Sequence, residues 1–201
     1  MKTIRVWDNG LPRNVIDEIV RELRDGAIMV WPTDTLYGVA CDALNPKAID
    51  AVCRLKGLNP DKNTLSIVCS DISQASEYAR IENEAFRLIK RLAPGPYTFI
   101  LRAASRLPKA FKGRKTVGIR IPGYEPARAI AEALGNPLLN TSIDFADEDY
   151  AVSPGLIAEA YEGRADIMLE GPDGLTEPST VIDCTTSDFT IVREGAGKEE
   201  V

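Results

Sequence analysis

Residues 31–42 read WPTDTLYGVACD, a predicted strand end followed by small polar residues. The apolar residues 27–31 predict a buried strand, and Thr33, Asp34 and Thr35 follow it. Two hydroxyls and a carboxylate at a strand end can orient a small polar ligand, and Gly38 allows a close approach of backbone or ligand. The same residue types also form ordinary capped turns. These residues alone leave a ligand site and a capped turn as equally good interpretations.

The absence of histidine limits the catalytic chemistry available to the chain. None of the 201 residues is histidine, which excludes Ser-His-Asp and Cys-His nucleophiles, an imidazole general base and a histidine-bound metal. The formal net charge of −6 argues against a protein that coats nucleic acid. Six basic residues and no acidic ones occur between Arg102 and Lys115. We interpret this run as a solvated loop rather than an RNA surface.

Length, cysteine positions and hydropathy indicate one intracellular domain. The length suits a single domain with a substantial core. The four cysteines, at positions 41, 53, 69 and 184, form no CxxC pair, so we predict reduced, mostly buried thiols and no metal site. No apolar run is long enough to cross a membrane, and residues 1–10 lack the apolar segment of a signal peptide. We therefore expect a cytoplasmic location and no membrane partner.

Apolar periodicity and turn residues predict helices and strands that alternate along the chain. Helices are expected over residues 12–25, 46–56, 71–79, 83–92, 125–134 and 154–161. Strands are expected over residues 27–31, 65–69, 97–102, 116–121, 138–142, 166–169, 179–183 and 189–193. In helix 83–92 the side chains expected to face inward are Ala85, Phe86, Leu88 and Ile89. The interleaving predicts one α/β domain over 1–201 with an open, twisted, mixed sheet, an ordered core at about 12–195 and a flexible tail at 196–201.

Polar or charged residues follow helices or strands at four further places. Lys56 ends a helix, where a cation could bind phosphate or interact with the helix dipole. Arg120 is the one charged residue of the strand segment TVGIRIP at 116–122, which indicates either a bound carboxylate or phosphate or a structural salt bridge. Ser142 ends another strand, and the segment PSTVID at 178–183 precedes Arg193. Neither GxxxxGK[ST] nor GxGxxG occurs, so a nucleotide would need an uncommon pocket.

Taken in order, these segments resemble the YrdC-like family, whose characterised members are threonylcarbamoyl-AMP synthases. The resemblance covers about residues 26–195. It rests on PTDTLYG with CDALNP, LKG, APGPYTFIL at 93–101, TVGIRIP, PSTVID and a downstream REG. It implies a YrdC/RibB-like α/β fold, in which helices flank an open twisted sheet around a large basic cavity.

The resemblance also implies that L-threonine, bicarbonate and ATP give threonylcarbamoyl-AMP and pyrophosphate. Partner proteins would then transfer the threonylcarbamoyl group to tRNA. By motif, threonine would contact Thr35, Arg120 and Ser179, and ATP would contact Lys56, Asn63, Thr116, Ser142 and Arg193. The catalytic residues would be Lys56 and Arg120, whose charges offset the triphosphate while threonine carbamate attacks the α-phosphate. Mg²⁺ is expected on the phosphates.

Two positions depart from the family pattern in the expected nucleotide site. Leu58, in KGL at 56–58, stands where arginine is expected, and Asp144, in SID at 142–144, stands where asparagine is expected. The first change removes a cation, and the second places a carboxylate near polyphosphate. Both resemble the YciO branch of the family. The alternatives are a weakly active synthase, an enzyme acting on another amine or acid, and a nucleotide- or double-stranded-RNA-binding protein without synthase activity.

Overall fold

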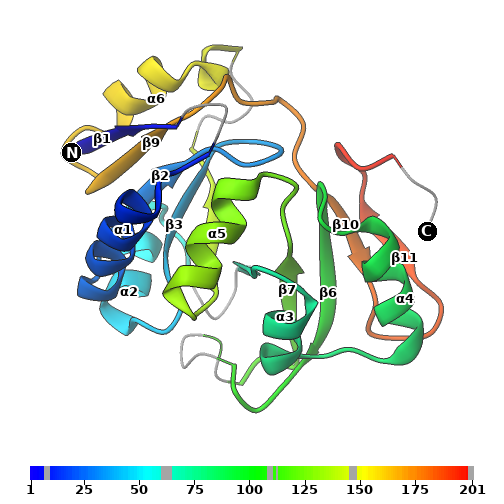
Figure 1. Ribbon diagram of the computed structural model, residues 1–201. Coiled ribbons are helices and arrows are strands. Elements are labelled where there is room, and N and C mark those ends of the chain that lie inside the picture. The colour runs from blue at the N-terminus through cyan, green and yellow to red at the C-terminus, as the bar shows by residue number, and fades with distance from the viewer. Residues whose placement is uncertain (7–9, 60–64, 108–110, 112, 145–148, 199–201) are drawn as a thin grey trace.

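A mixed, twisted sheet runs through the computed structural model, which describes residues 1–6, 10–59, 65–107, 111, 113–144 and 149–198 (Figure 1). Its described strands are β1 (Lys2–Arg5), β2 (Met29–Trp31), β3 (Gly38–Asp42), β4 (Ser66–Val68), β5 (Ala79–Arg80), β6 (Tyr97–Ala103), β7 (Thr116–Arg120), β8 (Leu138–Ser142), β9 (Ile167–Glu170), β10 (Thr180–Asp183) and β11 (Thr190–Arg193). They lie in the order β1-β9-β2-β3-β8-β4-β7-β6-β10-β11, and β5 pairs with β6. Parallel pairs such as β4–β7 and antiparallel pairs such as β6–β7 occur in the same sheet, which confirms the predicted mixed architecture.

Helices cover both faces of this sheet. They are α1 (Arg13–Asp25), α2 (Pro46–Leu55), α3 (Ile72–Tyr78), α4 (Asn83–Leu92), α5 (Glu125–Leu134) and α6 (Pro154–Tyr161), with a 3₁₀ helix at Asp149–Val152. The Asn45 side chain caps α2 by accepting hydrogen bonds from two backbone amides, and the Asp71 side chain caps α3 by accepting one. Gly26 and Gly135 end α1 and α5 with positive φ angles of 102° and 74°. Local sequence thus sets these four helix ends.

Two apolar clusters lie on opposite faces of the sheet. On one face α1 and α5 lie side by side and pack on strand residues such as Trp31, Val68 and Leu138 (Figure 1). On the other face α2, α3, α4 and α6 pack on residues such as Ile67 and Leu139. Consecutive residues of β4 and β8 therefore point into different clusters, as the two-residue period of a strand requires.

The structure confirms most predicted elements and adds three strands. Helices 83–92, 125–134 and 154–161 and strand 138–142 have the predicted bounds. The missed strands are β1, whose KTIR sequence has no clear apolar face, the two-residue β5, and β3, which is buried on both faces and follows a polar turn. The inward position of Phe86 was predicted wrongly, because this side chain is 44% exposed. Leu92 is buried instead and completes the helical spacing of Ala85, Leu88 and Ile89.

The chain ends and the cysteines complete the description of the fold. Two residues of the expected tail bond to the start of β10 and the residues before it, since Ala196 N donates to Pro178 O and Thr180 Oγ1 donates to Gly197 O. All four cysteines are buried and free, as predicted. Among the described residues, no helix has the length and apolar character needed to cross a membrane.

Candidate functional site

A polar cavity of about 360 Å³ opens on the face of the sheet that α1 and α5 cover further along the strands. In β8, Leu138 packs under those helices, while Asn140 and Ser142 point to the same side and line the cavity. In β4, Val68 likewise packs under those helices, while Ser66 lines the cavity. Beyond the reach of α1 and α5, this face of the sheet is therefore open to a ligand.

The cavity lining is rich in hydroxyls and carries positive charge. The described residues that line it are Ser66, Thr98, Ile100, Gly118, Arg120, Asn140, Thr141, Ser142, Ser179, Val181, Val192 and Arg193. They include two arginines and no carboxylate. A Cβ on Gly118 would lie 3.2 Å from the Ser66 Cβ and 3.3 Å from the Thr98 Cγ2, so glycine leaves space in the middle of the cavity. The lining suits a small ligand that carries negative charge.

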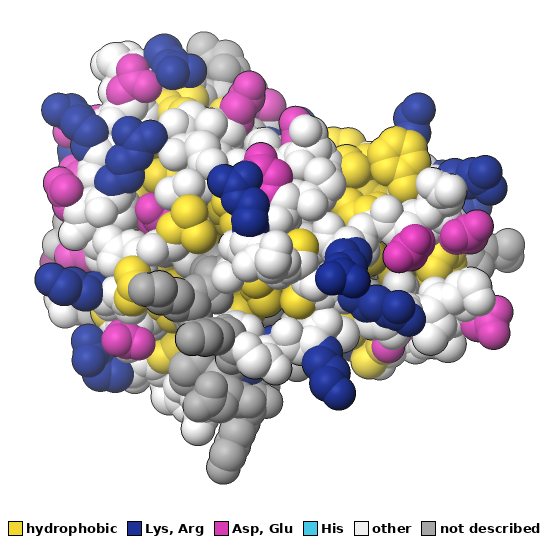
Figure 2. Space-filling view, turned by 90° about the horizontal axis from the view of Figure 1, so that it is seen from below, with side chains coloured by type: hydrophobic (Ala, Val, Ile, Leu, Met, Phe, Trp, Pro, Cys, Tyr) yellow, Lys and Arg dark blue, Asp and Glu magenta, His cyan; other side chains and the backbone are white. Residues whose placement is uncertain are grey.

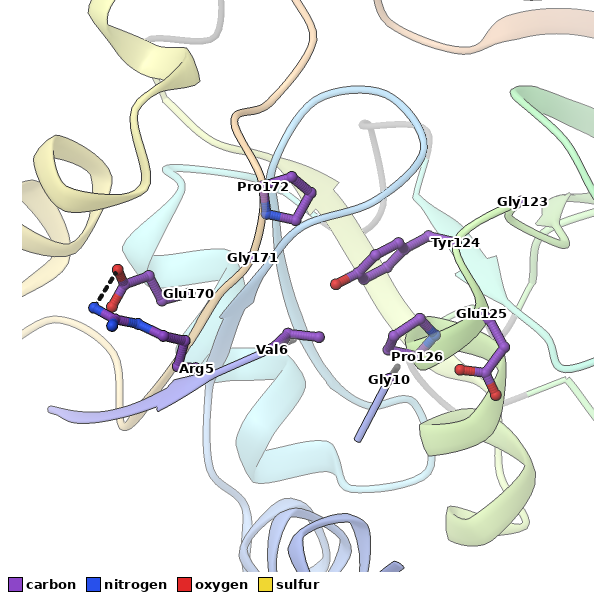
Figure 3. A pocket seen from close by; sticks show the side chains of 10 residues that line it. All are labelled: Arg5, Val6, Gly10, Gly123, Tyr124, Glu125, Pro126, Glu170, Gly171 and Pro172. Atoms are coloured by element: carbon purple, nitrogen blue, oxygen red, sulfur yellow. Dashed lines mark hydrogen bonds and ion pairs between the residues drawn. The ribbon is translucent and has the colours of Figure 1, made fainter. Parts of the chain in front are cut away.

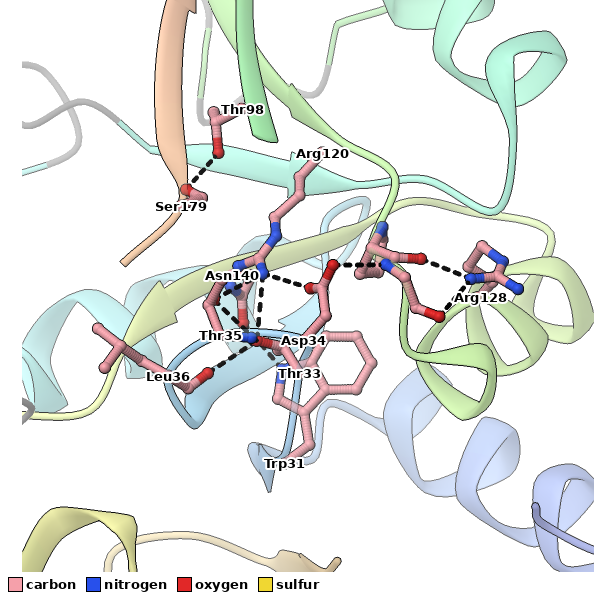
Figure 4. Close-up of polar contacts among 12 residues, drawn as sticks. Trp31, Thr33, Asp34, Thr35, Leu36, Thr98, Arg120, Arg128, Asn140 and Ser179 are labelled. Carbon is pink, nitrogen blue, oxygen red and sulfur yellow. Dashed lines mark hydrogen bonds and ion pairs between the residues drawn. The ribbon is translucent and has the colours of Figure 1, made fainter. Parts of the chain in front are cut away.

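Arg120 joins the cavity to the PTDTLYG segment (Figure 4). Its Nη2 lies 2.6 Å from Thr35 Oγ1 and 2.5 Å from Asp34 Oδ1. Asp34 also accepts a hydrogen bond of 2.6 Å from the Gly123 backbone amide through its other oxygen. Thr33 Oγ1 lies 3.2 Å from the same Nη2 and 3.1 Å from Thr35 Oγ1. The segment therefore orients the guanidinium from one side, which supports the ligand site over the capped turn.

The buried Arg120 side chain gives the strongest indication that this site binds an anionic ligand. The side chain is 6% exposed, and its buried Nε has no hydrogen-bond partner in the described part of the chain. Burial lowers the pKa of Arg120, and the neighbouring Asp34 carboxylate opposes that effect. An arginine remains protonated in proteins, so the group is a buried cation that pairs with Asp34 through Nη2 and whose Nε–H has no partner among the described residues. Arg193 adds a second positive charge to the lining, so a carboxylate or phosphate in the cavity would offset a net positive charge.

The centre of the site is positioned by Trp31 and Asn140, which were not among the predicted site residues. Trp31 Nε1 donates to Asn140 Oδ1 at 2.8 Å, and both residues are buried. A Cβ on Gly38 would overlap that amide oxygen, so glycine is required where β3 passes β8. The asparagine that directly follows two leucines in the LLNTS strand was the available sequence signal.

Ser179 and Arg193 meet at the other side of the cavity. The Ser179 hydroxyl lies 2.8 Å from Thr98 Oγ1 (Figure 4). Arg193 Nη2 donates to Ser179 O at 2.8 Å. The glycine of the REG segment, Gly195, packs against Pro178 so closely that a Cβ would overlap its carbonyl oxygen. The tertiary structure thus explains why PSTVID and REG, which are distant in sequence, act as one unit.

Of the other predicted ATP contacts, two do not line this cavity and one cannot be placed. Thr116 starts β7 and lines a separate hollow with Arg102 and Lys115. Lys56 is not among the described residues that line the cavity, and it forms an ion pair with Asp144. Asn63 lies outside the described residues. Ser142 does line the cavity, as do Arg120, Ser179 and Arg193.

A second, larger cavity of about 750 Å³ lies beyond Gly123 (Figure 3). Its lining includes the exposed ion pair of Arg5 and Glu170, whose atoms are 3.2 Å apart, and the ring of Tyr124. The Tyr124 hydroxyl is buried without a hydrogen-bond partner among the described residues, but it is uncharged. Since Arg5 is exposed and paired with Glu170, the described lining of this cavity has no buried cation like the Arg120 of the smaller one.

Comparison with known proteins identifies the family. The Sua5/YciO/YrdC family model, described as telomere recombination, matches residues 21–195. The chain belongs to the Sua5/YciO/YrdC family. It is 36% identical over 188 residues to the uncharacterized protein YciO of Escherichia coli K12, covering 92% of this chain and 91% of YciO. It is 31% identical over 166 residues to the threonylcarbamoyl-AMP synthase of Chromobacterium violaceum, covering 81% and 85% of the two chains.

Solved structures of the Sua5/YciO/YrdC family have the same fold. The crystal structure of E. coli YciO superposes with a TM-score of 0.89 at 34% identity and covers 98% of both chains. P. abyssi Sua5 complexed with L-threonine superposes with a TM-score of 0.87 at 28% identity, over 97% of this chain and 58% of Sua5. The predicted family and fold are therefore confirmed.

Proposed function

We propose that the chain binds L-threonine in the 360 Å³ cavity and converts it, with bicarbonate and ATP, to threonylcarbamoyl-AMP for tRNA modification. The observation that carries this proposal is the buried Arg120, which Asp34 and Thr35 hold beside the cavity and whose Nε has no hydrogen-bond partner among the described residues. A bidentate cation of this kind suits the threonine carboxylate. The threonine complex of P. abyssi Sua5 and the identity to a threonylcarbamoyl-AMP synthase support the same assignment.

In this proposal the chain acts by positioning and by charge. Arg120 and the Ser179 hydroxyl hold threonine, whose amine nitrogen bonds to the carbon of bicarbonate and gives a carbamate with loss of water. A carbamate oxygen then forms a bond to the α-phosphorus of ATP while the bond to pyrophosphate breaks. Ser142 and Arg193 line the cavity where they can contact phosphate. The described lining offers hydroxyl and amide oxygens but no carboxylate, so Mg²⁺ would be held mainly by phosphate oxygens and water.

The experiment is threonine binding by isothermal titration calorimetry to the wild type and to Arg120→Lys. Lysine keeps the charge but lacks the planar fork, so we expect affinity to fall about tenfold or more. Arg5→Lys is the matched control, because Arg5 pairs with Glu170 at the other cavity. The threonine affinity of this variant should equal that of the wild type. Unchanged threonine binding in Arg120→Lys would contradict the proposed site. Formation of threonylcarbamoyl-AMP and pyrophosphate from labelled bicarbonate then tests the reaction.

A second candidate is binding of a polyanion such as double-stranded RNA without synthase activity. Arg80, Arg102 and Lys115 surround a hollow of about 450 Å³. On the face drawn in Figure 2, however, acidic side chains lie among the Lys and Arg side chains. Salt-sensitive RNA binding that disappears when these three residues are neutralised would favour this candidate.

A further inference from the structure

Asp144 lies between two cations just beyond the end of β8. Its Oδ1 forms an ion pair with Lys56 Nζ, and its Oδ2 lies 3.1 Å from Arg164 Nη2. The Tyr161 hydroxyl, which is 3.3 Å from Oδ2, also accepts the Asp144 backbone N–H at 3.0 Å. The Arg164 guanidinium stacks on the Tyr161 ring at 5.1 Å. This carboxylate is therefore oriented by partners from two segments of the chain, one at the end of α2 and one at the end of α6.

Lys56 is the buried member of this cluster. Its side chain is 7% exposed, against 34% for Asp144 and 42% for Arg164. Burial lowers the pKa of Lys56, while the hydrogen bond and charge of Asp144 raise it. A buried ammonium without a carboxylate would be strongly destabilised, so Lys56 pairs with Asp144 whenever no other anion is present. Two cations share one carboxylate, so the three charged groups carry one excess positive charge.

The cluster is close in sequence to the cavity. Ser142, two residues before Asp144, is the last residue of β8 and lines the cavity. Ile143 N donates to Tyr37 O, which ties the connecting residue to the PTDTLYG segment. Lys56 and Arg164 follow α2 and α6, which pack on the other face of the sheet, so the cluster lies just past the end of β8, two residues beyond the cavity-lining Ser142.

We propose that Asp144 is a specificity-determining residue that occupies Lys56 and Arg164 and so weakens the binding of polyphosphate next to the cavity. This inference rests on the proposed function, because it concerns the nucleotide half of that site. With asparagine at position 144, Lys56 and Arg164 are free to pair with phosphate oxygens. With aspartate, a polyphosphate must displace the carboxylate and also experiences its repulsion.

The test is the affinity of the full chain for inorganic tripolyphosphate, measured by isothermal titration calorimetry without threonine. Asp144→Asn should bind tripolyphosphate about tenfold or more tightly than the wild type, and the gain should shrink at high salt. Glu77→Gln is the matched control. It removes the same charge from an exposed ion pair with Arg106, and its affinity should match the wild type.

A double-mutant cycle identifies the group that is released. Lys56→Gln should cost more tripolyphosphate affinity in the Asp144→Asn background than in the wild type. Asp144→Ser is the second variant if Asp144→Asn does not fold, since it also removes the carboxylate. The proposal is overturned by no gain in affinity, by an equal gain in Glu77→Gln, or by equal Lys56→Gln costs in both backgrounds. Because no threonine is present, these outcomes are independent of whether Arg120→Lys loses threonine binding.

Discussion

Gly38→Ala should destabilise the protein through the buried contact between Trp31 and Asn140. Trp31 is 0% exposed and Asn140 is 7% exposed, and the indole N–H donates to the amide oxygen at 2.8 Å. The new Cβ would overlap that oxygen and would lie 3.2 Å from Thr141 O. The Asn140 amide must move, because the backbone of β8 is fixed by its pairing with β3.

The expected cost combines a lost hydrogen bond and local overpacking. Leaving the Trp31 donor unsatisfied and crowding the strand pair together cost about 2–5 kcal/mol of unfolding free energy. For a chain of this size, that corresponds to a Tm lower by roughly 5–15 °C. Thermal unfolding followed by circular dichroism measures this directly. Faster exchange of the Trp31 indole proton, followed by NMR, would report the broken bond.

Gly155→Ala is the matched control for this prediction. Gly155 lies in α6, and a Cβ there meets nothing within 4 Å. The same added methyl group should therefore leave Tm unchanged or raise it slightly, since alanine favours helix. If Gly38→Ala melts within about 1 °C of Gly155→Ala, the proposed steric requirement at Gly38 is wrong.

Two further predictions concern stability. Burial raises the pKa of Asp144, but Lys56 and Arg164 hold it below the ordinary value of 3.8, so its stabilisation is complete above that pH and is lost as pH falls through the folded pKa. The Tm of the wild type should then fall more steeply below about pH 4 than that of Asp144→Asn, and parallel curves would argue against the ion pair. Phe86→Ala should change the unfolding free energy by less than about 0.5 kcal/mol, whereas Ile89→Ala should cost about 2–5 kcal/mol. Equal losses in urea titrations would show that the exposure of Phe86 is misassigned.

Local patterns were sufficient to predict most helices and several strands. Helix α4 has its predicted bounds because three- and four-residue apolar spacing and the Pro94-Gly95-Pro96 break both act locally. Phe86 was misplaced because it lies one residue from Ala85 and can be drawn on the same helical face until the sheet defines which side is buried. β3 was missed because a strand buried on both faces has no alternating pattern to read.

The site was predicted only in part, because local patterns can identify single residues but not the contacts between distant ones. A charge within an apolar strand identified Arg120 from sequence, and the structure places it with Thr35 and beside the cavity that Ser179 lines. The role of Asn140 depends on the pairing of β3 with β8, a relation between residues about 100 positions apart that no local pattern contains.

The sequence by itself determined the family, the α/β class, the caps of the helices and the types of residue available for chemistry, because these depend on composition and short-range spacing. The tertiary structure alone decided which charges meet. It turned Arg120 toward Asp34 and Thr35 and left its Nε without a partner among the residues that the structure describes. It also paired Lys56 with Asp144, 88 residues away. Electrostatic energy depends on separation in space and on burial, and both of these are fixed only when the strands are in register.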